Sequence, residues 1–144
     1  MDFNYRKLQV YSYSLDLVKK IYVIANNLPK EEQFALSDQL RRAAVSVPSN
    51  IVEGTGRGTN KDKAHFMSLA YGSLMEVMCQ IEIAYSVKYI TEEEFRNIEN
   101  SVDTVAKLLS GLRNSFLRSN DLQQNINKQE NPKVPQPSTL NAQQ

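Results

Sequence analysis

The chain has 144 residues, with 17 basic and 16 acidic side chains and a formal net charge of +1. This length suits one domain with a sizeable core, and the near-neutral charge gives no overall signal for nucleic-acid binding, since such domains usually carry a basic excess. A single cysteine, Cys79, excludes an intrachain disulfide, and no segment has the apolar length of a signal peptide or membrane span. We therefore expect a soluble, cytoplasmic protein that makes no membrane contact.

The first expected helix covers residues 5–28. Its apolar residues recur at steps of three and four along two neighbouring rows, which gives it a wide apolar face. Pro29 ends this helix, because the residue before a proline is pushed out of helical geometry. A short helical turn then follows over residues 30–36, with Phe34 as its apolar anchor.

The second expected helix extends to Glu53 or Gly54 and contains a proline in its interior. An interior proline removes a backbone donor and clashes with the carbonyl four residues earlier, at a cost of about 3 kcal/mol. We expect Pro48 to bend or loosen the helix and to free the carbonyl of Ala44 for a hydrogen bond from a Ser, Asn or Arg side chain. The side chains of Asn50, Glu53 and the neighbouring arginines are expected to complete a local network, and Gly54 to release the chain into a glycine-rich link.

The third expected helix begins near Thr59 or Asn60, either of which can accept a hydrogen bond from a free amide of the first turn. Like the first helix, it is apolar over a broad arc. Gly72 lies in its interior, where glycine costs about 1 kcal/mol of helix propensity. We therefore expect a small residue there because another helix approaches closely.

The fourth expected helix has a clear start in the run Thr91-Glu92-Glu93-Glu94, which fits a capping box. Apolar residues then repeat at alternating steps of three and four, a spacing that predicts left-handed bundle packing at a crossing angle near 20°. The row consists of Phe95, Ile98, Val102, Val105, Leu109, Leu112 and Phe116.

The composition changes after Asn120. Residues 121–144 hold ten Gln or Asn and three of the five prolines, with no aromatic residue. Such a segment buries too little surface to offset its ordering entropy, so disorder is predicted. The chain therefore divides into a bundle over residues 1–120 and a disordered tail over 121–144.

Four helices joined by short links predict an all-α fold, an antiparallel up-down four-helix bundle with a proline-interrupted second helix. The apolar arcs of the first and third helices are wider than one four-helix core requires, and tyrosines add amphipathic area of the kind found at interfaces. We therefore expect the protein to bind itself as a homo-oligomer.

The sequence offers little for catalysis. His65 is the only histidine, no serine has a nucleophile-elbow context, and no Glu-x-x-His pair supports a di-iron site. The glycine cluster at 54–58 lacks the Gly-Lys-Ser/Thr ending of a phosphate-binding loop. No enzyme activity, metal or cofactor is therefore expected. Glu53 and Glu76 are expected to pair with Arg41, Arg42 or exposed backbone groups near the proline.

A local basic cluster is the candidate for nucleic-acid binding. Its members are Arg41, Arg42, Arg57, Lys61 and Lys63, with the acidic residues largely elsewhere. An oligomer would multiply such a patch into a ring of positive charge. Two hypotheses follow: a non-catalytic homo-oligomer that contacts structured RNA through shape and phosphates, or a protein-interaction scaffold with no nucleic-acid role.

The run LSDQLRRAAVSVPSNIVEGTGRG followed by AYGSLMEV resembles the four-helix-bundle proteins encoded within intervening sequences of bacterial 23S ribosomal RNA genes. The resemblance covers roughly residues 5–118, with Val47 and Val52 where isoleucine and alanine are commoner. The motif residues that carry it are Ser46, Pro48, Asn50, Glu53, Gly54, Gly72, Ser73 and Glu76.

The resemblance implies a cyclic homopentamer of antiparallel four-helix bundles. It also implies a relation to the accessory proteins of diversity-generating retroelements, which share this fold and bind nucleic acid. RNA, such as 23S ribosomal RNA, or the nucleic acid of a retroelement is therefore the expected partner. Such a likeness of fold implies a function only by analogy.

Overall fold

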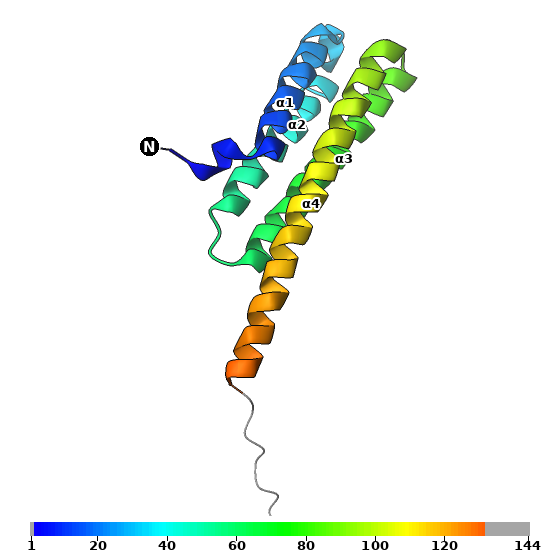
Figure 1. Ribbon diagram of the computed structural model, residues 1–144. Helices are drawn as coiled ribbons and strands as arrows, with labels where there is room; N and C mark the ends of the chain where they lie inside the picture. Colours follow the sequence, from blue (N-terminus) through cyan, green and yellow to red (C-terminus); the bar gives the residue numbers. More distant parts are fainter. Residues whose placement is uncertain (1, 132–144) are drawn as a thin grey trace, which may run out of the picture.

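The computed structural model describes residues 2–131, and within that range its regular elements are all helical. The α-helices are α1 (Gln9–Asn27), α2 (Leu36–Thr55), α3 (Asn60–Ser86) and α4 (Glu92–Glu130), and the 3-10 turns are η1 (Asn4–Lys7) and η2 (Lys30–Glu32) (Figure 1). Consecutive helices run up and down, which confirms the predicted all-α four-helix bundle.

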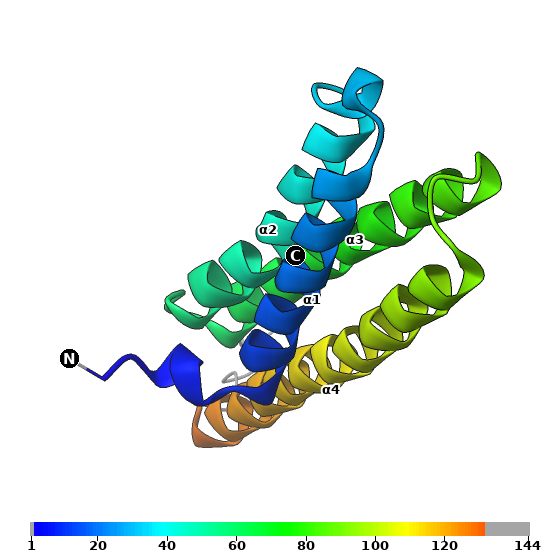
Figure 2. The same cartoon turned by 90° about the horizontal axis from the view of Figure 1, so that it is seen from above.

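The helices are grouped as two hairpins, α1 with α2 and α3 with α4. The α2–α3 and α3–α4 packing is the most extensive, and α1 packs less against α4. Viewed from above, the two hairpins diverge toward the end that carries the α1–α2 and α3–α4 links (Figure 2). The α2–α3 link lies at the opposite end, where α4 passes beside it (Figure 1).

The core is one cluster to which all four α-helices contribute. Removal of this apolar surface from water drives the helices together. The large side chains that it buries completely are Leu17, Ile21, Leu40, Val47, Ile51, Met67, Leu74, Val77, Ile81, Ile98, Val105 and Leu109.

The first helix differs from its expected bounds at the start. Leu8 is extended (φ −77°, ψ 127°) and separates η1 from α1. The helix ends before Pro29 as expected, with Leu28 at ψ 158°. Phe34 does not anchor the following turn, because it is 88% exposed while Leu36 takes the buried position at this end.

Both predicted N-caps are confirmed. The Thr59 hydroxyl accepts a hydrogen bond from the Asp62 amide at 3.1 Å. At the start of α4, the Thr91 hydroxyl accepts from the Glu94 amide and the Glu94 carboxylate accepts from the Thr91 amide, each at 3.1 Å. These caps satisfy amides that the first turn of a helix leaves free.

The end of α3 carries a cap that its sequence does not signal. Lys88 has φ 66°, and its amide donates to the Tyr85 carbonyl at 3.0 Å, while the Tyr89 amide donates to the Ala84 carbonyl at 2.8 Å. This is the Schellman arrangement, in which the left-handed residue is usually glycine. Because the left-handed position is occupied by lysine and not by glycine, the sequence lacks the usual signal for the end of a helix.

The prediction of disorder from residue 121 onward is wrong for residues 121–130, which continue α4 to Glu130. The composition of this segment predicts that it buries little surface. It nevertheless continues a helix that is already nucleated, so each added residue gains a backbone hydrogen bond without a new nucleation cost. Asn131 leaves helical geometry at φ −127° and ψ 73°, directly before Pro132. Residues 132–144 lie outside the described residues, so their disorder stays a prediction.

Candidate nucleic-acid interface

The basic end of the bundle is centred on the α2–α3 link, where Arg57 is held by two contacts. Its guanidinium donates to the Glu53 carboxylate at 2.6 Å and lies 4.3 Å from the centroid of the Phe66 ring. Such stacking and pairing orient a guanidinium and leave some of its five donors free. The predicted pairing of Glu53 with Arg41 or Arg42 is therefore wrong, because Arg57 takes that place.

Two lysines follow on the first turns of α3. The Lys63 ammonium lies 5.7 Å from the centroid of the Phe116 ring on α4. Lys61 is exposed, and within residues 2–131 it forms no ion pair. The link thus places Arg57, Lys61 and Lys63 at one end of the molecule, as a cluster of adjacent cations.

Arg113 joins this cluster, although it was not among the predicted site residues. Its Nε donates to the Ser68 hydroxyl at 2.8 Å, which fixes the side chain across the α3–α4 contact. The position of Arg113 could have been predicted from the antiparallel arrangement of the last two helices, because it places the end of the heptad row on α4 beside the start of α3. We define the basic end as Arg57, Lys61, Lys63 and Arg113.

Arg41 and Arg42 do not belong to this end. The Arg41 guanidinium donates to the Asn26 side chain at 2.7 Å and lies 5.9 Å from the centroid of the Tyr22 ring. Arg42 pairs with Asp38 at 3.0 Å. They precede Thr55 at the end of α2 by 13 residues or more, which is about 20 Å of helix.

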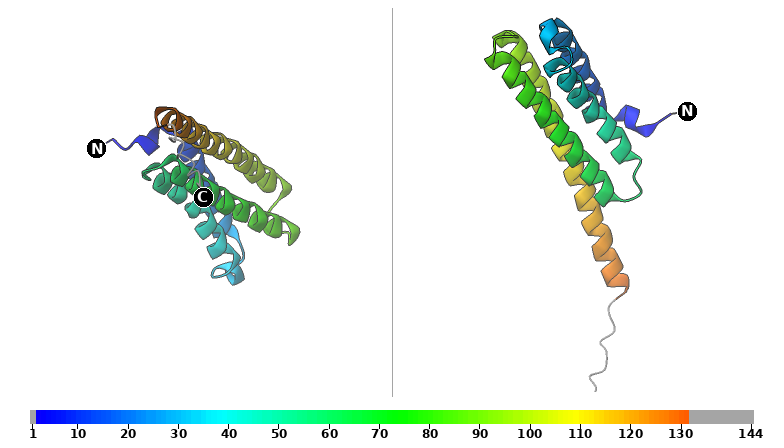
Figure 3. Two further views of the ribbon diagram at one scale, coloured as in Figure 1. Left: turned by 90° about the horizontal axis from the view of Figure 1, so that it is seen from below. Right: turned by 180° about the vertical axis from the view of Figure 1, so that it is seen from behind.

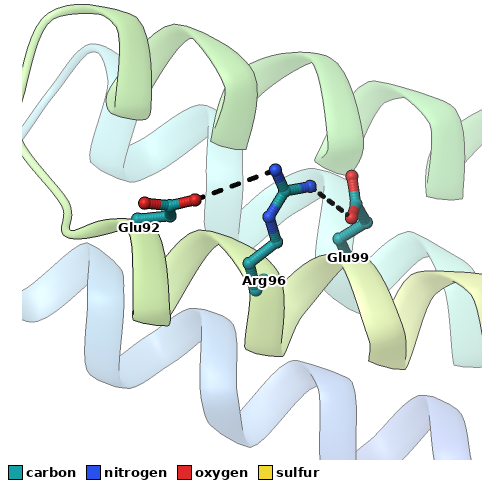
Figure 4. A network of polar contacts seen from close by, with 3 residues as sticks. All are labelled: Glu92, Arg96 and Glu99. Carbon is teal, nitrogen blue, oxygen red and sulfur yellow. Dashed lines mark hydrogen bonds and ion pairs between the residues drawn. The ribbon is translucent and has the colours of Figure 1, made fainter.

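The opposite end of the bundle gathers acidic side chains from the α1–α2 and α3–α4 links. Arg96 lies between Glu92 at 3.9 Å and Glu99 at 2.9 Å, and its hydrogen bond to Glu99 raises the arginine pKa (Figure 4). The Tyr89 phenol donates to the Glu32 carboxylate at 3.2 Å, which raises the pKa of Tyr89. Charge is therefore separated along the long axis of the bundle.

The motif residues around Pro48 form a polar network that includes Asn50, as predicted, but not Glu53 or the arginines. The Ser46 hydroxyl lies 2.8 Å from the Ser73 hydroxyl on α3, and the Asn50 amide donates to the Ser46 carbonyl at 2.9 Å and to its hydroxyl at 3.0 Å. The motif therefore joins α2 to α3 at mid-height.

The carbonyl of Ala44 receives no side-chain hydrogen bond among the described residues, contrary to the prediction. Instead, the Ser49 hydroxyl donates to the Val45 carbonyl at 2.8 Å. The helix continues through Pro48 to Thr55, so the proline does not divide it, and a bend there stays a prediction. Glu76 is exposed and forms no ion pair within the described range.

The two motif glycines have roles opposite to those predicted. Gly54 does not end α2 but is buried within its last turn, where an added Cβ would lie 2.6 Å from Met67 Cε and 2.7 Å from Phe66 Cβ. Gly72 faces open space, with no atom within 4 Å of an added Cβ. The close helix approach expected at Gly72 therefore occurs at Gly54.

The described part of the chain shows no group of three or more histidine, cysteine or acidic side chains placed to hold a metal ion. Over the same residues, no helix is both long enough and apolar enough to cross a membrane. The arrangement that stands out is electrostatic: a basic end with aromatic supports, opposite an acidic end.

Comparison with known proteins places this fold in a family. Residues 6–111 match the family model described as 23S rRNA-intervening sequence protein. A solved structure from Bacteroides thetaiotaomicron, a protein of unknown function from the S23 ribosomal protein family, is similar with a TM-score of 0.65 and 25% identity, over 72% of this chain and 97% of that one. Among curated proteins none matches. Because the family match spans most of the chain, from η1 into α4, this protein belongs to the 23S rRNA-intervening sequence protein family.

Proposed function

We propose that this protein is a non-catalytic, homo-oligomeric nucleic-acid-binding bundle that contacts structured RNA, such as 23S ribosomal RNA, through its basic end. The observation that carries the proposal is the grouping of Arg57, Lys61 and Lys63 in and just after the α2–α3 link, with Arg113 on the neighbouring part of α4. Arg57 and Lys63 rest on aromatic rings, so they present charge with little side-chain freedom left to lose. Phosphate contacts of this kind supply most of the non-specific affinity of nucleic-acid-binding proteins.

The family's printed name supports RNA as the partner, since it refers to sequences within 23S ribosomal RNA. The net charge of +1 is compatible with this proposal, because the acidic side chains at the opposite end of the bundle cancel most of the positive charge of the basic end. Local potential rather than net charge decides where a polyanion binds.

Salt dependence tests the phosphate contacts. If each protomer neutralises about three phosphates, affinity for a 23S ribosomal RNA fragment should fall about fortyfold between about 50 and 200 mM salt. The variant Arg57→Ala/Lys61→Ala/Lys63→Ala should bind more than about tenfold more weakly and reduce the salt slope by about three. Fluorescence anisotropy with a labelled fragment measures both quantities.

The matched control is Lys30→Ala/Lys88→Ala/Arg96→Ala, which removes one arginine and two lysines from the acidic end. Both triple variants change the net charge by the same amount, so only position differs. Equal weakening by the two variants would show that net charge, and not the basic end, drives binding. Wild-type affinity that is absent at low salt would contradict the proposed function itself.

Self-association is supported by the outer face of α3, which exposes large apolar side chains beside charged ones such as Glu76 and Glu82. Leu69 is 41% exposed, Met75 39%, Ile83 45% and, just past the helix, Val87 51%. Wide apolar exposure of this kind marks interaction surfaces. A homopentamer, as the resemblance implies, would cover this face and set several basic ends side by side.

Sedimentation equilibrium tests the assembly. Wild-type protein is expected to be oligomeric at micromolar concentration, and Ile83→Asp should weaken association at least tenfold, about 1.4 kcal/mol, because it places a charge in the apolar face. Asn114→Asp on the exposed side of α4 adds the same charge away from that face and is expected to leave association unchanged. A wild-type monomer at this concentration would end the oligomer proposal.

The alternative function, a protein-interaction scaffold without a nucleic-acid role, also has an observation in its favour. Phe34 is 88% exposed at the acidic end, opposite the basic end. Capture of partners from lysate with and without nuclease separates the two functions. Partners that persist after nuclease treatment favour the scaffold.

A further inference from the structure

The part of α4 past Phe116 extends beyond the bundle. Phe116 is the last α4 residue of the described chain that packs against the core. Residues 117–130, which we call the overhang, continue the same helix, and their outer part extends past the α2–α3 link, as two opposite views show (Figures 1 and 3). The match to the family model ends at residue 111, so the overhang lies outside the matched residues.

The foot of the overhang lies at the basic end. Lys63 contacts Phe116, and α3 begins at Asn60, three residues or about 4.5 Å nearer the end of the bundle. Because α4 runs antiparallel to α3, Asn120 is level with the start of α3. The overhang and the link therefore form a corner, with cations at its base.

The inner face of the overhang carries amide side chains. Helical periodicity continues the row of Leu109, Leu112 and Phe116 into Asn120, Gln123 and Asn127. Asn120 is partly buried, and the Gln123 amide donates to the Asn127 side chain at 3.3 Å, so these groups share one side. Glu130 lies on the same row about one turn further along, so this face ends at an acidic side chain.

We propose that the overhang contacts unpaired bases of a structured RNA whose phosphates rest on the basic end. The inference depends on the proposed nucleic-acid binding and adds a substrate class to it: a loop or bulge beside a helical stem. Carboxamides offer a donor and an acceptor in one plane and pair with base edges, and only unpaired bases of RNA expose those edges fully. The row from Asn120 to Asn127 spans about 10 Å, room for two or three nucleotides.

The test compares two RNA probes with the full-length protein. One is a hairpin with an unpaired loop, and the other is a blunt duplex in which the same stem is lengthened by further base pairs until the number of phosphates is equal. Wild-type protein is expected to bind the hairpin roughly tenfold more tightly, the discrimination that one good amide–base pair supplies. The variant Asn120→Ala/Gln123→Ala/Asn127→Ala should bind both probes equally, with its duplex affinity unchanged.

A matched control exists on the opposite side of the same helix. Asn114→Ala/Asn125→Ala/Gln129→Ala also removes two asparagines and one glutamine, from positions that face away from the row. Alanine is the strongest helix former, so neither variant shortens α4, and far-ultraviolet circular dichroism checks this. The control should keep the wild-type preference for the hairpin.

Each outcome bears on a different claim. Equal loss of preference in both variants, or none in either, overturns the assignment of the inner face. Wild-type binding to both probes with no preference overturns this inference and leaves the proposed function standing. Failure of the wild type to bind either probe overturns the proposed function, and the inference with it.

Discussion

Gly54→Val is expected to lower the free energy of unfolding by about 3 kcal/mol, the upper range for overpacking of a well-packed site. The first added carbon alone would lie 2.7 Å from Phe66 Cβ and 2.6 Å from Met67 Cε. The methionine end can move aside, but the phenylalanine Cβ is tied to the backbone of α3, so the two helices must separate. Urea unfolding of the purified variant, followed by circular dichroism, measures the change.

Gly72→Val is the matched control, because it makes the same substitution at the other motif glycine. No atom lies within 4 Å of an added Cβ there, so the change in stability should stay within about 0.5 kcal/mol. If Gly54→Val were as stable as Gly72→Val, α2 and α3 would not be as close at that point as the structure has them.

Leu74→Ala is expected to destabilise the bundle by about 2 to 5 kcal/mol. Leu74 is completely buried at the middle of α3, the helix that packs against both α2 and α4. Truncation leaves a cavity that neither neighbouring helix fills without losing its own contacts. Chemical denaturation at several protein concentrations is the measurement, because a loss of assembly makes stability depend on concentration and the loss of a core contact does not.

Leu69→Ala makes the same change on the opposite side of α3, where the side chain is 41% exposed. The part of its loss of stability that does not depend on protein concentration should be less than about 1 kcal/mol, since little apolar area within the single chain returns to water. The pair of variants thus separates the two apolar faces of α3, one of which holds the fold. A larger effect at Leu69 than at Leu74 would contradict the orientation of the helix.

Local signals were enough to predict where α3 and α4 begin. Thr59 and Thr91 cap their helices through groups within three residues, so the sequence alone specifies both starts. The heptad row of α4 likewise placed the core, with Phe95 through Leu109 buried. The close approach of two helices depends on packing between distant segments, and this is why the roles of Gly54 and Gly72 were exchanged.

The candidate site was only partly predictable for the same reason. Arg57, Lys61 and Lys63 lie close together in the sequence and remain so in the fold, whereas Arg41 is separated from them by most of α2. Arg113 reaches the cluster through tertiary packing, which no spacing within α4 reveals. The helical overhang was not predicted, because an estimate from composition treats the segment as a free chain that has to be ordered. In the protein the segment continues a helix that is already ordered.

The opposite signs of charge at the two ends make the molecule an electric dipole about as long as α3, whose 27 residues span about 40 Å. In the electric field of a polyanion, such a molecule rotates before contact so that its basic end faces the polyanion. This alignment reduces the number of unproductive collisions and strengthens as salt is lowered, since the screening length grows to about 30 Å at 0.01 M. The glutamates around Arg96 would then affect the rate of association with a polyanion, although they lie at the end of the bundle opposite the proposed contact.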